Sequence, residues 1–332
     1  MSRHFNNNRA HMLGAALLSA MTLIGCASGS ASGSTSDSAA DDAQSVEHAA
    51  FSGDSAYAYV ARQVEFGPRV PNTAAHRAAG DWLIGELRRH GAEVVEQPLR
   101  LRAFDGTMLD ARNIMGQYNP DASERLLLLA HWDCRPWADE DDDESRHKQP
   151  VDGANDGASG VGVLLEIARQ LGRQAPSKGV DILFVDAEDW GSSGDEDSWA
   201  LGAQAFVENP PVAGYLPKEG ILLDMVGGKD ACFYREYFSD RSAGALNSRL
   251  WQIAGQLGYS SRFPNASGFA VTDDHVRFIE AGIPTVDIIE YNREAGGFNP
   301  RWHTSSDTME GISAETLQAV GSVVAEYIRK YY

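Results

Sequence analysis

Carboxylate and imidazole side chains recur after apolar segments that have the pattern of strands, from residue 131 onward. His131 and Asp133 follow one such segment, Glu188 and Asp189 follow the next, and Asp224 ends a third. In open α/β sheets, ligands bind at the carboxyl ends of the strands. We therefore expect these side chains to gather at one rim of a sheet. Neighbouring loops would add further candidates, which are Asp156, Asp273, Asp274, His275 and His303.

Mixed His and carboxylate ligands suit zinc, which catalytic sites hold with three protein groups and one position open to water or substrate. The adjacent acids Glu188 and Asp189 suit a division of labour, in which one binds the metal and its neighbour moves protons. The sequence contains no Gly-x-Ser-x-Gly elbow, no phosphate loop and no Gly-x-Gly-x-x-Gly fingerprint. Serine hydrolases and nucleotide-binding enzymes are therefore poor alternatives.

The elements that would position these residues alternate along the chain. Largely apolar strands between helices indicate an α/β fold with a mostly parallel sheet covered on both faces, and an earlier antiparallel pair makes the sheet mixed. Helices are predicted over 55–66, 74–90, 161–171, 201–207, 246–257 and 314–328, the last with Ser313 as its N-cap. Strands are predicted over 93–104, 113–118, 125–130, 180–185, 221–223 and 284–289.

The composition limits the kinds of partner. The chain has 332 residues, of which 43% are hydrophobic, as is usual for a globular protein. It carries 28 Lys and Arg against 47 Asp and Glu, a formal charge of -19. We expect no nucleic-acid partner, because so acidic a protein repels phosphate. No linker or repeat interrupts residues 48–332, which we interpret as one catalytic domain. The acidic run at 139–144 is interpreted as a solvated loop, with a loose calcium site as the alternative.

The first residues have the pattern of a bacterial lipoprotein leader. A basic start and a short apolar run end in Leu-Ile-Gly-Cys, which resembles a lipobox and predicts a signal peptide over 1–25 and lipidation of Cys26. A plain signal peptide with an incidental Cys is the alternative. Residues 26–47 would be a flexible tether. We therefore expect a periplasm-facing lipoprotein of the bacterial cell envelope, on the outer membrane. Whether Cys134 and Cys232 pair there stays open.

The ordered set of acids and imidazoles resembles the zinc aminopeptidase family that includes the bacterial secreted leucyl aminopeptidases. That resemblance implies a three-layer α/β/α sandwich. Several motifs resemble one branch of that family more closely, the animal-type glutaminyl-peptide cyclotransferases (glutaminyl cyclases). These motifs are Asp273-Asp274-His275, Gly282-Ile283-Pro284, Trp302-His303-Thr304 with Phe298 before it, and Leu223-Asp224-Met225-Val226-Gly227.

The cyclase resemblance implies one zinc per chain and assigns a role to each candidate. Asp156, Asp189 and His303 would hold the zinc, and Glu188 would be the general acid/base. Asp224 and Asp273 would be hydrogen-bonded acids beside Glu188, and Trp302 and Phe298 would line the pocket for the glutamine side chain. The sequence departs from the animal enzymes, which have Glu in place of Asp189 and His in place of Asp287. A further pocket Trp could be Trp190 or Trp199.

The implied reaction converts the N-terminal glutamine of a peptide or protein to pyroglutamate and releases ammonia. The alternative is a dizinc aminopeptidase, in which His131 and Asp224 complete a second metal site bridged by Asp156. A catalytically silent binding lipoprotein would need a missing ligand or base, and none is missing. The natural substrates and the oligomeric state stay open.

Overall fold

The computed structural model describes residues 50–291 and 296–332, so the predicted leader, the tether and Cys26 lie outside the described residues. Hydroxyl side chains cap three of the described α-helices, those that begin at Gly53, Ala74 and Ala314. Ser52 accepts a hydrogen bond from the N–H of Ser55, and Ser313 accepts one from Thr316, as predicted for an N-cap. The α-helices are α1 (Gly53–Val64), α2 (Ala74–Arg89), α3 (Ala158–Arg173), α4 (Leu201–Glu208), α5 (Tyr237–Gln256), α6 (Asp274–Glu280) and α7 (Ala314–Tyr331).

Six strands form one mixed sheet. They are β1 (Glu93–Arg102), β2 (Met108–Tyr118), β3 (Arg125–His131), β4 (Gly179–Val185), β5 (Glu219–Asp224) and β6 (Thr285–Ile289), in the order β1-β2-β4-β3-β5-β6. The pairs β1–β2 and β2–β4 are antiparallel, whereas β4, β3, β5 and β6 run parallel to one another. The predicted mixed, mostly parallel sheet is confirmed.

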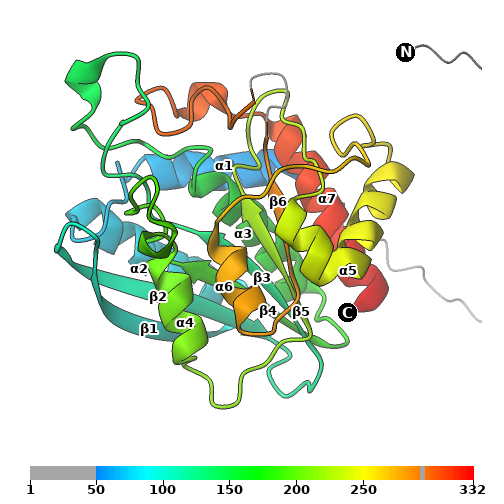
Figure 1. Cartoon of the computed structure of the whole chain (residues 1–332). Coiled ribbons are helices and arrows are strands. Elements are labelled where there is room, and N and C mark those ends of the chain that lie inside the picture. The colour runs from blue at the N-terminus through cyan, green and yellow to red at the C-terminus, as the bar shows by residue number, and fades with distance from the viewer. Residues whose placement is uncertain (1–49, 292–295) are drawn as a thin grey trace, which may run out of the picture. The chain divides into compact units, whose positions relative to one another are not determined.

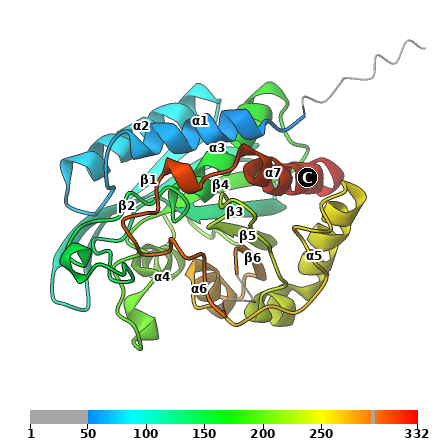
Figure 2. The ribbon, with the colours of Figure 1, turned by 90° about the horizontal axis from the view of Figure 1, so that it is seen from above.

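Helices cover both faces of the sheet, which gives three layers. α1, α2, α3 and α7 lie on one side of the strands, and α4 and α6 lie on the other (Figure 1, Figure 2). Alternate residues of β3 serve the two sides: Leu126 and Leu128 belong to the larger core under α3, and Leu127 and Leu129 belong to the smaller core under α4 and α6. All seven residues of β3 are buried, as expected of a central strand in such a sandwich.

Two predicted boundaries were wrong. Helix α5 begins at Tyr237 rather than near residue 246, because the carboxylate of Glu236 accepts hydrogen bonds from the N–H groups of Phe238 and Ser239 and starts a polar first half. That half carries no apolar periodicity, and it is separated from the second half by a kink at Ala243. Asp274 and His275 lie in the first turn of α6 instead of a loop, since Asp273 caps this short helix.

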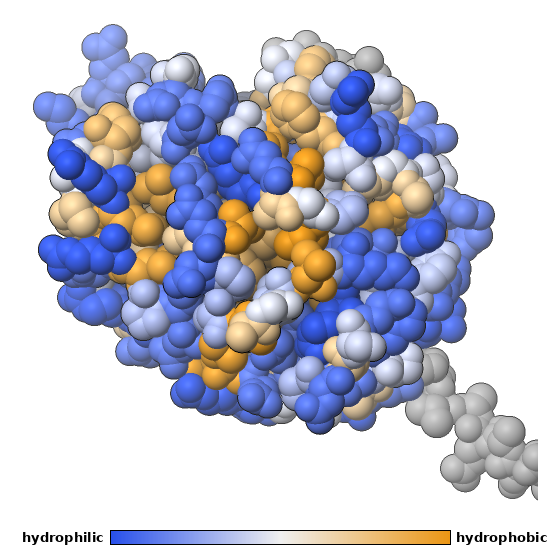
Figure 3. Space-filling model, turned by 60° about the horizontal axis from the view of Figure 1, so that its bottom comes forward, coloured by the Kyte–Doolittle hydropathy of each residue, from blue (hydrophilic) through white to orange (hydrophobic). Residues whose placement is uncertain are grey.

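The face of the described part shown in Figure 3 is mostly hydrophilic. On the face in Figure 3, hydrophobic side chains gather in hollows between hydrophilic ones. None of the helices among the described residues has the length and hydropathy needed to cross a bilayer. Cys134 is buried, Cys232 is partly exposed, and both thiols are unpaired.

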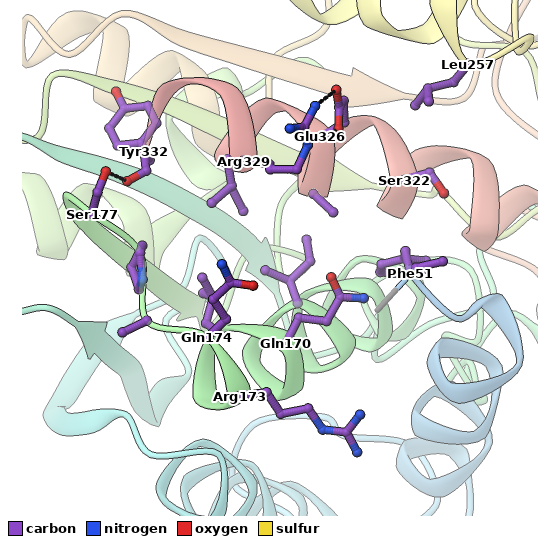
Figure 4. A pocket seen from close by; sticks show the side chains of 17 residues that line it. Phe51, Gln170, Arg173, Gln174, Ser177, Leu257, Ser322, Glu326, Arg329 and Tyr332 are labelled. Carbon is purple, nitrogen blue, oxygen red and sulfur yellow. Dashed lines mark hydrogen bonds and ion pairs between the residues drawn. The ribbon is translucent and has the colours of Figure 1, made fainter. Parts of the chain in front are cut away.

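A cavity of about 650 Å³ opens between α3 and α7 (Figure 4). Phe51, Gln170 and Gln174 line it together with the C-terminal turns of α7. Gln170 and Gln174 belong to the C-terminal end of α3, and the metal-ligand candidate Asp156 precedes the N-terminal end of the same helix. The cavity is therefore separate from the predicted catalytic residues.

Candidate metal centre and active site

The predicted rim of acids and imidazoles forms where the parallel strands end. β3 ends at His131 and β5 ends at Asp224. Ala187, which precedes Glu188, and Met225, which follows Asp224, both have left-handed backbone with φ of 54° and 46°. These conformations are uncommon for residues other than glycine and turn the chain sharply after each strand. The turn at Ala187 leads into Glu188 and Asp189, and Asp224 lies at the end of β5 within hydrogen-bond distance of His131.

Asp156, Asp189 and His303 converge at the centre of this rim. One potential ligand atom from each lies within 4.8 Å of the others, and all three residues are buried. His303 Nε2 lies 3.0 Å from Asp189 Oδ1 and 3.5 Å from Asp156 Oδ2. The structure therefore brings together the three residues that the resemblance names as zinc ligands.

The donor set fits a divalent metal ion. Both carboxylate oxygens of Asp189 are buried and have no hydrogen-bond partner among the described residues, although His303 Nε2 lies only 3.0 Å from one of them. A buried carboxylate that accepts no hydrogen bond is unfavourable unless a cation or a proton neutralises it. Two carboxylates and an imidazole aimed at a common point are ligands that zinc prefers. Asp156, Asp189 and His303 would hold it.

His131 forms a second cluster with Asp156 and Asp224, also within 4.8 Å. Its Nε2 atom hydrogen-bonds Asp224 Oδ1 at 3.1 Å and lies 2.9 Å from Asp156 Oδ1. The carboxylate of Asp224 thus accepts a hydrogen bond, whereas that of Asp189 has only ion-pair contacts, with His303 and Arg135. The predicted second metal site is present as a set of side chains, but a direct hydrogen bond already joins two of its members.

Gly157 makes the close approach of these segments feasible. Its φ of 88° is a left-handed conformation, and a Cβ atom there would lie 2.5 Å from the backbone oxygen of Asp133 and 3.1 Å from the His131 ring. Any larger residue would be strained and would collide with the rim. The Gly-rich segment before α3 therefore serves to place Asp156 against β3.

Glu188 and Asp273 lie in the same buried, acidic surroundings. Burial raises the pKa of Glu188 well above its ordinary value, and the charges of Asp273 and Asp189 raise it further against the opposing effect of His131. Burial also raises the pKa of Asp273 to about 7, and the charge of Asp224 adds to that rise. A carboxyl group with a raised pKa is suited to accept and return a proton near neutral pH.

Aromatic rings enclose His303 on two sides. The ring of Trp302 stacks on it with centroids 3.7 Å apart, and Trp199 lies nearly parallel to it at 6.0 Å. Phe298 packs against Trp302 at 4.8 Å. Trp190 instead packs edge-on against Trp137, so Trp199 is the tryptophan of this loop that reaches the metal-ligand candidates.

Residues 113–328 match the profile of Peptidase family M28. This segment is more than half of the chain. The chain belongs to peptidase family M28.

Solved structures related to this M28 chain carry two kinds of name. The structure of Porphyromonas gingivalis glutaminyl cyclase is 53% identical, with a TM-score of 0.84, and the match covers 85% of this chain and 99% of that one. A leucine aminopeptidase precursor from Bacteroides thetaiotaomicron is 48% identical, with a TM-score of 0.83 and coverage of 86% and 99%. Both matches confirm the α/β fold.

Curated relatives are more distant. The glutaminyl-peptide cyclotransferase-like protein of Bos taurus is 25% identical over 67% of this chain and 61% of its own length. The chain spans about three fifths of the length of the curated relatives that head this comparison. The predicted likeness to animal enzymes is thus a distant one, and the bacterial cyclases are considerably more similar.

Two acids support the M28 site by accepting backbone hydrogen bonds, and the sequence analysis had placed only one of them, Asp133, at this rim. The carboxylate of Asp307 accepts hydrogen bonds from the N–H groups of Asn155 and Asp156, at 2.8 and 3.1 Å. Asp133 accepts in the same way from the N–H groups of Glu188 and Asp189, both at 3.2 Å. Asp133 was visible in the His-x-Asp spacing, but Asp307 carried no signal, since a lone acid in a polar loop is common.

The acidic run at 139–144 was predicted to be a solvated loop, but two of its carboxylates have partners within the M28 domain. Asp139 is ion-paired with the buried Arg135 and faces the ring of His303. Asp141 accepts hydrogen bonds from the N–H and hydroxyl of Ser305. The run therefore folds against the loop that carries His303, because two of its carboxylates find partners there.

A third cluster of buried acids lies next to Asp273. Asp273, His275 and Asp287 have potential ligand atoms within 4.8 Å of one another. Asp287 is the residue in whose place the resemblance to the animal enzymes implies a His. Burial raises the pKa of Asp287 well above its ordinary value, and Asp273 adds to the rise. His275 and Asp287 therefore form, with Asp273, a buried cluster of titratable groups that adjoins the M28 site.

Proposed function

We propose that this protein is a glutaminyl-peptide cyclotransferase, which converts the N-terminal glutamine of peptides or proteins to pyroglutamate and releases ammonia. The observation that carries the proposal is the aromatic enclosure of the metal-ligand candidate His303 by Trp302 and Trp199, with Phe298 beside Trp302. Such a wall suits a short, folded-back amide side chain. Relatives at about 50% identity that are named glutaminyl cyclases support it.

The proposal includes one zinc per chain, held by Asp156, Asp189 and His303. Neither oxygen of Asp189 accepts a hydrogen bond among the described residues, which supports a metal at this position, whereas the hydrogen bond between His131 and Asp224 supports a metal-free second cluster. When bound, zinc supplies Lewis-acid polarisation of the glutamine side-chain carbonyl and so makes a poor electrophile reactive.

Glu188 would move the proton that the reaction must transfer. The α-amine nitrogen forms a bond to the side-chain carbonyl carbon, and the bond from that carbon to the amide nitrogen breaks. Glu188 would take one proton from the α-amine nitrogen as this nitrogen attacks, and would give that proton to the leaving amide nitrogen, which departs as ammonia. Asp224 and Asp273 would be the hydrogen-bonded acids beside Glu188. The aromatic wall would keep the amine near the carbonyl, which lowers the entropic barrier.

A dizinc aminopeptidase is the second candidate. The cluster of His131, Asp156 and Asp224 favours it, since its ligand atoms lie within 4.8 Å and Asp156 belongs to both clusters. The relative named as a leucine aminopeptidase precursor favours it as well.

One experiment separates the two candidates. Purified protein is incubated with a peptide that begins with Gln and, separately, with the same peptide beginning with Leu. We expect ammonia and a blocked, full-length peptide from the first, and no free leucine from the second. Mass spectrometry distinguishes loss of ammonia from loss of a residue. Free amino acid together with a shortened peptide would establish the aminopeptidase instead.

We also propose that Cys26 is lipidated and that the domain faces the periplasm on the outer membrane. The leader pattern in the sequence supports this. Cys26→Ser should release the protein to the soluble fraction or leave the precursor unprocessed. Unchanged size and membrane association in that variant would refute the lipid anchor.

A further inference from the structure

We propose that Arg135 is a positioning residue of the metal centre, which holds Asp189 and His303 in place for the metal through three separate contacts. Arg135 lies four residues after His131, in the segment that leaves β3, and is only 3% exposed. The inference rests on the metal-binding part of the proposed function. It is independent of whether the reaction is cyclisation or hydrolysis.

The first contact fixes the loop of the paired acids. Nη1 of Arg135 donates to the backbone oxygens of Asp189 and Gly191, at 3.0 and 2.9 Å. The same nitrogen lies 3.9 Å from the carboxylate of Asp189. Arg135 thus holds the backbone of one ligand candidate and places a positive charge beside its side chain.

The second contact reaches His303 through Asp139. Nε and Nη2 of Arg135 donate to the two carboxylate oxygens of Asp139, at 3.0 and 2.6 Å. Asp139 Oδ1 in turn lies 3.7 Å from His303 Nδ1, and the N–H of Glu140 donates to the backbone oxygen of His303. A metal-binding His commonly has a carboxylate opposite its free ring nitrogen, which fixes the ring and its tautomer.

The third contact reaches His303 through an aromatic ring. The guanidinium carbon of Arg135 lies 4.8 Å from the centre of the Trp199 ring and 5.1 Å from that of Trp137. Trp199 lies nearly parallel to the ring of His303, with an angle of 15° between their planes. Of the two rings, Trp199 therefore links Arg135 to a metal-ligand candidate, whereas Trp137 belongs to an apolar cluster.

The arrangement needs the shape of an arginine as well as its charge. A planar guanidinium can donate to a carboxylate with two nitrogens, donate to two carbonyls with the third, and stack on a ring at the same time. The ammonium of lysine has a compact charge and cannot keep all of these contacts. Lysine at this position should therefore weaken metal binding even though it preserves the charge.

The test compares two conservative variants in the full-length protein. The zinc dissociation constant is measured by competition with a chromophoric chelator, and thermal unfolding is recorded for the zinc-free protein. Arg135→Lys should weaken zinc binding by about 10- to 100-fold, the usual range for residues that orient metal ligands. Arg125→Lys is the matched control, because Arg125 is also buried and also pairs with one carboxylate and several carbonyls, at the opposite end of β3. It should leave the zinc dissociation constant unchanged.

Asp139→Asn provides a second, milder variant, which keeps the shape of the side chain and removes its charge. It should weaken zinc binding by a smaller factor than Arg135→Lys, and it tests the link to His303 even where Arg135→Lys fails to fold. Zinc affinity equal to wild type in folded Arg135→Lys, or in Asp139→Asn where the first variant does not fold, would overturn the proposal. Equal loss of affinity in Arg125→Lys would also overturn it, because the effect would then be general destabilisation.

Discussion

The two ends of strand β3 carry buried charges that are treated in opposite ways. At the N-terminal end, Arg125 donates to Asp181 and to the backbone oxygens of Asn119, Pro120 and Ala122. Asp181 also accepts hydrogen bonds from the Gln117 amide and the Tyr215 hydroxyl. At the C-terminal end, both oxygens of Asp189 lack a hydrogen-bond partner among the described residues.

This difference separates structural from functional charge. A buried carboxylate whose oxygens are satisfied from several sides needs nothing further, so the Arg125 end stabilises the sheet without binding anything. Asp189 has only the imidazole of His303 at 3.0 Å and the guanidinium of Arg135 at 3.9 Å beside its carboxylate, and a buried acid without hydrogen bonds is unfavourable unless a cation or a proton neutralises it. We therefore expect the end near Asp189 to be complete only when the proposed metal is bound, and the following changes test that contrast.

The largest effect should follow from loss of a ligand. His303→Ala, Asp156→Ala and Asp189→Ala should each abolish tight zinc binding, because each removes one of three protein ligands. Zinc content after dialysis and the zinc-induced rise in Tm measure this, and the rise should disappear in the variants. If a variant retained a full equivalent of zinc, the residue replaced in it would not be a zinc ligand.

Glu188→Gln should come next, with zinc retained and turnover reduced by about two to four powers of ten, the usual contribution of general acid–base catalysis. Glutamine keeps the size of the side chain but cannot take up a proton. Steady-state ammonia release and metal analysis on the same preparation check both parts. Loss of zinc together with activity would make Glu188 a ligand rather than the proton carrier. Asp273→Ala should likewise impair turnover and leave zinc bound.

At the other end of β3, Arg125→Ala should destabilise the protein by about 3–5 kcal/mol, since it leaves the buried carboxylate of Asp181 without its cation. The zinc affinity of the fraction that remains folded should equal that of the wild type. Urea unfolding of the zinc-free protein gives the free energy, and chelator competition gives the affinity. A large loss of zinc affinity would erase the proposed separation between the two ends.

The smallest effect is expected for His147→Ala. This imidazole lies close to the metal-site loops, but it only hydrogen-bonds the backbone oxygen of Asp141 at 2.7 Å. Removing it should reduce stability by about 1 kcal/mol, the usual contribution of one such bond, and leave zinc binding intact. If a competing chelator removed zinc from this variant but not from wild type, His147 would have to be counted among the ligands.

The sequence was most informative where one physical pattern dominated. Periodic apolar residues located α2 and α7, and the run of leucines in β3 placed a buried strand within one residue of its observed end. The short helix α6 was missed, because seven residues beginning with Asp274 and His275 carry too few apolar positions to show a period. The first half of α5 was missed for the same reason.

The site shows the same division. Resemblance to a known family named Asp156, Asp189 and His303, and the fold brings them together. Arg135 and Asp139 could not be found in this way, because a single Arg or Asp in a polar segment predicts no particular partner. Their importance appears only when folding brings residue 139 next to residue 303.

The left-handed backbone at Ala187, Met225 and His303 has a consequence for engineering. Each such residue other than glycine holds the chain in a conformation that is unfavourable by about 1–2 kcal/mol. Glycine at position 187 would relieve that strain in the folded protein, yet it would also give the paired-acid turn more freedom to reorient. Selection for heat resistance and selection for turnover should therefore favour different residues at this position. The alanine keeps the turn rigid but leaves the backbone strained there.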